Sequence, residues 1–411
     1  MLRSMFLIVF FSLVLVIISP THIHAAPWVS GYYPGWTQSR MKPTDIDYSA
    51  VTHIMHFAAI PKSDGSLDTS QNMIDPYIAS TISATHAAGK KILITLGGAN
   101  SQNGFRVATT QANRTKLISS IVNFMKSNNY DGIDVDWEPL ADTDSAQFTA
   151  FITELRAAMT QQQPGSLLTA AAMVETPQLY IPVKDMFDQI NIMTYVMSGP
   201  WEGWVTWHSA PLKNGGRTFS NGRPLPSVET AVKAYLDAGI SKTKLGIGTH
   251  FGGSIWSGGG VTGPRQSFTS GTTVNADTPY YTIMDTYHQA QNYHYDTEAD
   301  AAYLSINSAQ DANDKFISYD NAESIAKKIS YLKTAQLGGI IIWELNQGYF
   351  PNAAVGQRDP LLKALKEAIG NTEPTAGPTG PTCSNLQGDT NHDGAVRIDD
   401  FAVWRSIYLA Q

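Results

Sequence analysis

The stretch YDGIDVDWEPL at residues 130–140 has the period-two pattern of a β-strand. Asp134, Asp136 and Glu138 lie two residues apart, so in an extended chain their side chains point to one face. The residues between them are apolar and point to the other face. Three neighbouring carboxylates, spaced roughly 6–7 Å along a strand, cannot all be ionised inside a protein. The pattern therefore predicts shared protons, hydrogen-bond partners or a cation, and coupled carboxyl groups are typical of acid–base catalysis.

Two other interpretations of this stretch have to be weighed. A calcium loop of the EF-hand type needs glycine at its sixth position, and counting from Asp134 that position is Pro139. Counting from Asp131, it is Asp136. A carboxylate metal site at the end of a strand remains an alternative, whereas a purely structural role is disfavoured because buried like charges repel.

The rest of the chain alternates between strand-like and helix-like patterns. Besides the acidic strand, apolar runs predict strands at 28–33, 51–58, 91–96, 167–173, 189–195, 244–250 and 339–343. Apolar residues at three- and four-residue spacing predict helices at 75–88, 115–126, 146–159, 228–238, 322–334 and 361–369. Eight strands with intervening helices predict an α/β protein whose parallel sheet closes as a (β/α)8 TIM barrel. An open doubly wound sheet is the alternative, but no G-x-G-x-x-G follows the first strand.

In such a barrel the active site lies at the C-terminal ends of the strands. Glu138 is the last carboxyl group of the fourth strand, so we expect its side chain to emerge at the mouth. Asp136 and Asp134 would then lie progressively deeper, where they can tune and orient the outermost acid.

Several motifs in this barrel carry a family resemblance. The D-G-x-D-x-D-x-E pattern at 131–138 resembles the signature of the chitinases of glycoside hydrolase family 18. The segments GYYPGW, TLGG, MTY, FISYD and GGIIIWE resemble other motifs of that family, at residues 31–36, 95–98, 193–195, 316–320 and 338–344. The resemblance covers residues 27–370, which fits one barrel, and we assign residues 26–370 to this catalytic domain.

The resemblance implies a secreted chitinase that hydrolyses β-1,4-linked N-acetylglucosamine with retention of configuration. Glu138 would protonate the leaving oxygen and then activate water. Asp136 would hold the substrate's acetamide, whose carbonyl oxygen attacks the anomeric carbon, and Asp134 would share a proton with Asp136. Tyr195 would donate a hydrogen bond to the acetamide, and no cofactor would be needed for catalysis. The substrate-binding residues implied are Tyr32, Phe57, Met193 and Trp343, with Trp343 as the floor of the subsite where the sugar is distorted.

The chain departs from the family pattern around the acids, but keeps the acids themselves. Val196 stands where aspartate often follows the tyrosine, Pro139 follows the glutamate in place of tyrosine, and Ala99 replaces an aromatic residue. The segment FGG at 251–253 stands where F-Y-G is usual. These differences concern the sugar-binding subsites on either side of the cleaved bond.

Two inserts extend the predicted barrel. Trp201, Trp204 and Trp207 follow the sixth strand at a spacing of three, and they either stack on sugar rings or pack the loop down. Residues 253–315 are long for a single loop. They resemble the small α+β insertion that some family members carry between strands seven and eight, where it walls one side of the cleft.

Other functions remain open at this point. Relatives of the same barrel act as endo-β-N-acetylglucosaminidases or on peptidoglycan, and others are chitin-binding lectins. Such lectins usually lose the acid, and Glu138 is present. From outside the family, a carboxylate metal enzyme is the further alternative.

Composition limits the partners and the compartment. The chain has 411 residues with 28 basic and 35 acidic side chains, a formal charge of −7, and no basic run, which argues against nucleic acid or an anionic membrane as a partner. Arg3, the apolar run at 5–18 and the small residues Ala25 and Ala26 predict a secretory signal peptide over residues 1–25. We therefore expect an extracellular protein.

The C-terminal part of the sequence predicts a separate calcium-binding segment. Residues 371–385 are a Pro/Thr/Gly-rich linker that contains Cys383, the only cysteine, so no internal disulfide is possible. Residues 386–411 resemble half of a dockerin module, with Gly394 at the turn of a calcium loop. The expected Ca²⁺ ligands are Asp389, Asn391, Asp393, Ala395 and Asp400. The tail could bind a protein or cell-surface partner, and an unbound Asp/Asn turn is the alternative.

Overall fold

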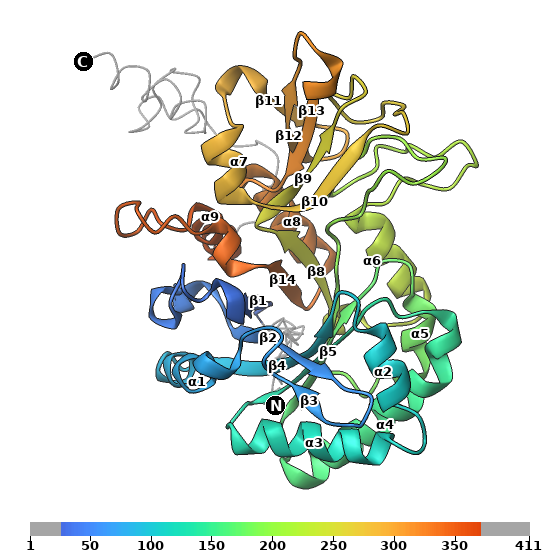
Figure 1. The fold of residues 1–411 in the computed structure, drawn as a ribbon, viewed down its shortest axis with the longest axis vertical. Helices are drawn as coiled ribbons and strands as arrows, with labels where there is room; N and C mark the ends of the chain where they lie inside the picture. The colour runs from blue at the N-terminus through green and yellow to red at the C-terminus, as the bar shows by residue number, and fades with distance from the viewer. Residues whose placement is uncertain (1–25, 371–411) are drawn as a thin grey trace, which may run out of the picture. The chain divides into compact units, whose positions relative to one another are not determined.

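A closed barrel of eight parallel strands dominates the computed structural model, which describes residues 26–370 (Figure 1). The barrel strands are β1 (Trp28–Pro34), β2 (His53–Pro61), β4 (Lys91–Gly98), β5 (Gly132–Trp137), β6 (Leu167–Ala172), β7 (Gln189–Ile192), β8 (Leu245–His250) and β14 (Gly339–Trp343). Strand β1 pairs in parallel with both β2 and β14, which closes the sheet. The predicted (β/α)8 barrel is confirmed. The predicted signal peptide (1–25), linker (371–385) and calcium-binding segment (386–411), with all five expected Ca²⁺ ligands, lie outside the described residues.

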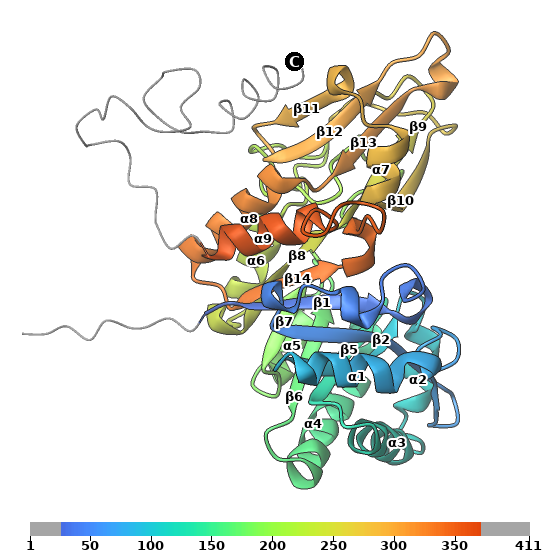
Figure 2. The same ribbon diagram turned by 90° about the vertical axis from the view of Figure 1, so that its left-hand side faces the viewer.

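Helices surround the barrel strands (Figures 1 and 2). They are α1 (Ile78–Ala87), α2 (Gln102–Ala108), α3 (Arg114–Ser127), α4 (Ser145–Gln162), α5 (Pro177–Tyr180), α6 (Val228–Asp237), α8 (Ala322–Ala335) and α9 (Pro360–Gly370). The sequence pattern did not predict α2 and α5, because helices of seven and four residues are too short to show a helical period. Across residues 26–370, no helix combines the length and apolarity needed to cross a membrane.

The two faces of β5 are used differently. Its apolar side chains Ile133, Val135 and Trp137 are buried in the layer between the strands and the helices. There Trp137 stacks on Phe105 of α2, with ring centroids 4.6 Å apart. The alternating acids consequently point to the inside of the barrel, as the period of two requires.

A second sheet is inserted between β8 and β14. It is antiparallel, in the order β10-β9-β13-β12-β11, and forms the upper part of Figure 1. Its elements are β9 (Gly252–Ser257), β10 (Thr273–Pro279), helix α7 (Tyr280–Thr286), β11 (Tyr293–Asp296), β12 (Ala301–Ile306) and β13 (Lys315–Tyr319). One face packs Ile255, Leu304 and Ile317 against Ile283 of α7. The predicted α+β insertion is confirmed, and it has a small core of its own.

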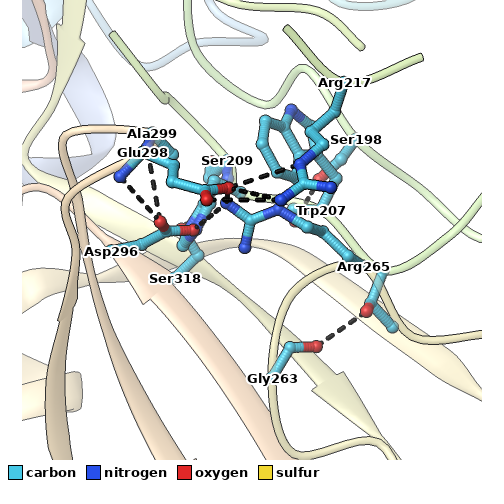
Figure 3. A network of polar contacts seen from close by, with 12 residues as sticks. Ser198, Trp207, Ser209, Arg217, Gly263, Arg265, Asp296, Glu298, Ala299 and Ser318 are labelled. Atoms are coloured by element: carbon cyan, nitrogen blue, oxygen red, sulfur yellow. Dashed lines mark hydrogen bonds and ion pairs between the residues drawn. The ribbon is translucent and has the colours of Figure 1, made fainter. Parts of the chain in front are cut away.

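A polar network attaches the long loop after β7 to this insertion (Figure 3). His208 of the loop is fully buried, and its Nε2 lies 2.9 Å from Oδ2 of Asp296, while Nδ1 lies 3.0 Å from Oγ of Ser318. Arg265 completes the cluster with an ion pair to Asp296 at 2.6 Å, and its guanidinium lies over the ring of Trp207. The loop is therefore fixed to the insertion by buried and charged contacts.

A buried ion pair joins the insertion to the barrel. The ammonium group of Lys328 on α8 contacts Asp320, and both side chains are almost completely buried. Oδ2 of Asp320 also accepts hydrogen bonds from Oγ1 of Thr249, at 2.8 Å, and from the amide of His250, at 3.0 Å. The pair thereby connects the end of β8 with α8.

Replacing Lys328 with methionine should destabilise the protein strongly, because Asp320 would be left as an unpaired buried charge. We expect the free energy of unfolding in urea to fall by about 3–5 kcal/mol. The matched control is Lys327→Met, at an exposed position of the same helix. Adding Asp320→Asn to Lys328→Met should recover part of the loss. A Lys328→Met protein as stable as the control would contradict this account.

Candidate active site

The C-terminal ends of the barrel strands open into a cavity of about 690 Å³. Both Asp136 and Glu138 reach it. The other lining residues are Trp36, Phe57, Ile60, Gln71, Asn72, Gly97, Gly98, Ala99, Met173, Val174, Glu175, Met193, Tyr195, Val196, Met197, Trp201, Asp277 and Trp343. The acids therefore meet a space large enough for several sugar units, bounded by aromatic and apolar side chains.

The three acids, two on β5 and Glu138 directly after it, lie at three depths. Glu138 is half-buried and lines the cavity, Asp136 is 3% exposed at its base, and Asp134 is completely buried. Only the outer two acids can touch a ligand.

Asp134 is held by hydroxyl groups from the adjacent strands β4 and β6 and from β1 across the barrel. Its carboxyl oxygens accept from Tyr32 Oη at 2.9 Å, Thr95 Oγ1 at 3.2 Å and Thr169 Oγ1 at 2.6 Å. Burial raises the pKa of Asp134, and these three hydrogen bonds partly oppose that rise. The described contacts of Asp134 are to these hydroxyl groups, and the expected proton sharing between Asp134 and Asp136 stays a prediction.

Asp136 shares a hydrogen bond with Glu138. Burial raises the pKa of Asp136 well above its ordinary value, and the nearby charges of Glu138 and Asp134 raise it further. The pKa of Glu138 is also raised by burial, although the hydrogen bond to Asp136 lowers it in part. These directions describe two carboxyl groups that hold one proton between them.

One carboxyl oxygen of Asp136 makes no hydrogen bond within the described part of the chain. Its Oδ1 atom is buried and has no hydrogen-bond partner among residues 26–370. A buried polar atom without a partner is costly, unless a water molecule or a ligand supplies the contact. The base of the cavity therefore offers one unused hydrogen-bonding position directly below Glu138.

The start of α2 fixes the main chain around Glu138. The amide of Glu138 donates to Oγ of Ser101 at 3.1 Å, and that hydroxyl donates to the carbonyl of Asp136 at 3.3 Å. The amide of Gln102 donates to the carbonyl of Glu138 at 2.9 Å. These bonds hold the end of β5, so the glutamate is presented from a rigid segment.

Glycines at the end of β4 allow its close approach to β5. Gly97 and Gly98 have φ values of 104° and 105°, which L side chains rarely adopt. A Cβ on Gly97 would lie 2.2 Å from the carbonyl oxygen of Asp136, and one on Gly98 would lie 2.4 Å from the ring of Phe57. The two glycines of the TLGG segment thus leave space for the main chain of Asp136 and for the ring of Phe57.

Tyr195 and Met193 line the cavity just beyond β7. Burial, followed by the charges of Asp136 and Glu138, raises the pKa of Tyr195 well above its ordinary value. Its hydroxyl therefore keeps its proton and can donate a hydrogen bond. Val196, where the family pattern often has aspartate, adopts a φ of 53° that strains a β-branched residue.

The expected aromatic residues lie in two layers. Phe57 and Trp343 line the cavity, with ring centroids 5.0 Å apart in an edge-to-face arrangement. Tyr32 lies one layer deeper: it is 1% exposed, contacts the ring of Trp343 at 5.7 Å and donates to Asp134. In this structure Tyr32 supports the site from below and does not line the cavity.

The sequence left open whether the three tryptophans of the loop after β7 stack on sugar rings or pack the loop down, and the structure shows both positions. Trp207 is completely buried, and Trp204 packs on Phe219 at 4.5 Å between ring centroids. Trp201 is 50% exposed and lines the cavity. Trp36, which ends the GYYPGW segment, is a second exposed tryptophan at the cavity and was not predicted as a site residue.

Asp277 of β10 is a cavity residue that the sequence gave no reason to single out. It accepts hydrogen bonds from His250 Nε2 at 2.9 Å, Gln347 Nε2 at 2.8 Å and Trp343 Nε1 at 3.2 Å. Burial raises the pKa of Asp277, but these contacts outweigh it and lower the pKa to about 2. The insertion therefore places a permanently ionised carboxylate beside the floor of the cavity.

Metal ligation was the main alternative use of the acidic strand. Between residues 26 and 370, no group of three or more His, Cys, Asp or Glu side chains is arranged to hold a metal ion. Of the acids on β5, Asp134 is engaged with hydroxyl groups, and Asp136 interacts with Glu138.

A parallel barrel with a coupled carboxyl pair at its mouth and aromatic walls defines a glycoside-hydrolase type of site. Comparison with known proteins supports this class of site. The chain belongs to the glycosyl hydrolases family 18, whose family model matches residues 29–348.

Two chitinases among the relatives are distant in sequence. Chitinase A1 of Niallia circulans is 28% identical, over 93% of this chain and 58% of its own length. Probable chitinase 10 of Drosophila melanogaster is 25% identical, over 86% of this chain and 16% of its own length. The chain thus spans less than two thirds of each of these two relatives. The crystal structure of Ostrinia furnacalis Group IV chitinase superposes with a TM-score of 0.70 at 23% identity, covering 84% of this chain and 99% of that one, which shows the shared fold.

Proposed function

We propose that this chain is a chitinase that hydrolyses β-1,4 linkages between N-acetylglucosamine units with retention of configuration. The observation that carries the proposal is the Asp136–Glu138 pair at the base of the cavity, with its unpartnered Asp136 oxygen. Membership of glycosyl hydrolases family 18 and the similarity to Chitinase A1 support the choice of substrate.

In the first step Glu138 donates its proton to the glycosidic oxygen. The carbonyl oxygen of the substrate's own acetamide forms a bond to the anomeric carbon as the glycosidic bond breaks, and the bonding electrons leave with the departing sugar. Asp136 accepts a hydrogen bond from the acetamide N–H. As a carboxylate, it also stabilises the resulting oxazolinium cation. Glu138 then removes a proton from the water that opens this ring.

The site offers little support for a covalent intermediate on Asp136. Asp136 on β5 lies deeper than Glu138, which directly follows the strand, and its carboxyl group is hydrogen-bonded to that of Glu138. A carboxyl group that holds the acetamide from below needs no direct path to the anomeric carbon. In this mechanism Tyr195 donates to the acetamide oxygen, and Phe57, Met193 and Trp343 bound the sugar ring.

Three alternatives concern the substrate and the presence of catalysis. An endo-β-N-acetylglucosaminidase or a peptidoglycan hydrolase would use the same acids, and a lectin would bind without cleaving. The retained Glu138 at the cavity argues against the lectin. Rates should therefore be compared on chitin oligomers, glycoproteins with N-linked glycans, and cell-wall peptidoglycan. We expect the highest kcat/KM on chitin oligomers, and binding without release of shorter oligomers would overturn the enzymatic proposal.

Secretion and calcium binding are further parts of the proposal. Expression in a secreting host should yield an extracellular protein that begins at Ala26.

The full chain should bind Ca²⁺ in calorimetry, and Asp389→Ala should abolish that binding. Chitin hydrolysis should withstand EDTA, since catalysis is assigned to carboxyl groups alone. A protein or cell-surface partner of the tail should be bound only in the presence of Ca²⁺.

A further inference from the structure

The charged groups that line the cavity have one sign. Besides Asp136 and Glu138, the carboxyl groups of Glu175 and Asp277 reach it, and no lysine, arginine or histidine of the described chain does. A cavity with fixed negative charge attracts cationic groups and disfavours anionic ones. A chitin chain is neutral when every sugar is acetylated, whereas each deacetylated sugar carries an ammonium group at C2.

Asp277 is held as a rigid acceptor. Its Oδ1 accepts from both His250 and Gln347, and its Oδ2 accepts only from the indole N–H of Trp343, at 3.2 Å. The side chain is still 45% exposed. An ionised carboxylate oxygen can accept more than one hydrogen bond, so Oδ2 has capacity left for a group in the cavity.

The position of Asp277 relative to Trp343 matters for a bound sugar. Because the indole N–H points along the edge of its ring, the carboxylate that accepts it lies beside the indole rather than over its face. A sugar stacked on the face of Trp343 directs its equatorial substituents outward, toward groups at the edge of the indole. Asp277 is therefore placed to meet substituents of a stacked chain.

The strand that carries Trp343, a hydrogen-bond partner of Asp277, is opposite the strand that carries Asp136. In the closed order β1-β14-β8-β7-β6-β5-β4-β2, the strand of Trp343 and the strand of Asp136 are four places apart. Successive β-1,4-linked sugars are turned over relative to each other, so their C2 substituents alternate between the two sides of the chain. When one sugar directs its acetamide to Asp136, a neighbour directs its C2 group to the opposite wall.

We propose that the cavity selects partly deacetylated chitin, with the C2 ammonium of a glucosamine unit against Asp277 next to the acetylated unit held by Asp136. This inference rests on the proposed chitinase function and names the substrate class of that site. A charge-assisted hydrogen bond from an ammonium to a carboxylate is stronger than one from a neutral hydroxyl or amide, which gives the selection its physical basis. With a pKa of about 2, the carboxyl group of Asp277 is ionised near neutral pH.

The test is an analysis of the chain ends that the purified full-length protein produces from soluble, partly deacetylated chitosan. The sugars on both sides of each cleaved bond are identified by NMR and mass spectrometry. We expect glucosamine to be enriched at one position near the cleaved bond. Asp277→Asn should reduce that enrichment by about tenfold, as loss of one charge-assisted hydrogen bond predicts, and high salt should weaken it in the wild type.

A single-charge control separates a local contact from the general field of the cavity. Glu175→Gln removes the same charge from the same cavity, and we expect it to preserve the enrichment within about twofold. Equal losses in the two variants, or no enrichment with the wild-type protein, would overturn the assignment to Asp277. The wild-type enrichment and its salt dependence test the selection itself even if Asp277→Asn does not fold. Failure to cleave a fully acetylated hexamer would instead overturn the proposed function itself.

Discussion

Glu138→Gln is expected to lower kcat/KM on chitin oligomers by about 10²–10⁴-fold, the usual contribution of general acid–base catalysis. Glutamine fills the same space at the cavity but has no acidic proton to transfer to the leaving oxygen. The measurement is the initial rate of oligomer hydrolysis, and binding of the oligomer should persist. Glu175→Gln is the matched control, since it changes another cavity carboxyl group with no assigned part in bond cleavage.

The pH profile gives the same experiment a second readout. Burial raises the pKa of Glu138, so the acid form persists to a higher pH than in an ordinary glutamate. Because the first step needs the protonated form, activity should be lost as the pH rises through this raised pKa. The residual activity of Glu138→Gln should lack that limb. A variant that keeps wild-type rates would remove Glu138 from the mechanism.

Asp136→Asn is the second large expected effect, with a loss of about 10²–10³-fold in kcat, similar to removal of one stabilising group from a charge-developing site. Asparagine preserves the size of the side chain but cannot carry the negative charge that stabilises the oxazolinium cation. The rate should be measured on an oligomer whose reacting sugar has an acetamide.

Thermal unfolding distinguishes this loss from a folding defect. The neighbouring acids and burial make a charge on Asp136 unfavourable in the folded protein. Replacing it with a neutral residue should therefore leave the melting temperature unchanged or higher. A large drop in melting temperature with a proportional loss of activity would contradict a catalytic role and indicate a structural one.

The acidic strand shows what sequence can predict about this protein. The period of two determines which side chains of a strand share a face. The eight apolar strands predict a barrel, and in such barrels the active site lies at the C-terminal ends of the strands. Asp134 and Asp136 on β5, and Glu138 directly after it, consequently lie at increasing height inside the barrel. These relations depend on local geometry and on a fold with few alternatives.

Contacts between distant segments were beyond such reasoning. Asp277 lies on an insertion strand and accepts a hydrogen bond from Trp343, which is 66 residues further along the chain. No local sequence pattern predicts such a contact. The depth of Tyr32 also depends on packing, because its alternation on β1 does not reveal that its hydroxyl meets Asp134. The same is true of the hydrogen bond between Asp136 and Glu138, since it depends on side-chain rotation and protonation.

The end of β7 illustrates a third limit. The apolar pattern predicted a strand through Tyr195, but β7 ends at Ile192. The chain then turns, with Val196 at positive φ, to bring Met193 and Tyr195 to the cavity. Tertiary contacts override strand propensity there, as they often do at functional sites.

The stereochemistry of the first product tests the central claim most directly. Attack by the acetamide on one face of the sugar, followed by water on the same face, preserves the β configuration. Proton NMR during the first minutes of hydrolysis should therefore show the β-anomer before mutarotation. An α-anomer formed first would contradict substrate-assisted catalysis by Asp136 and Glu138.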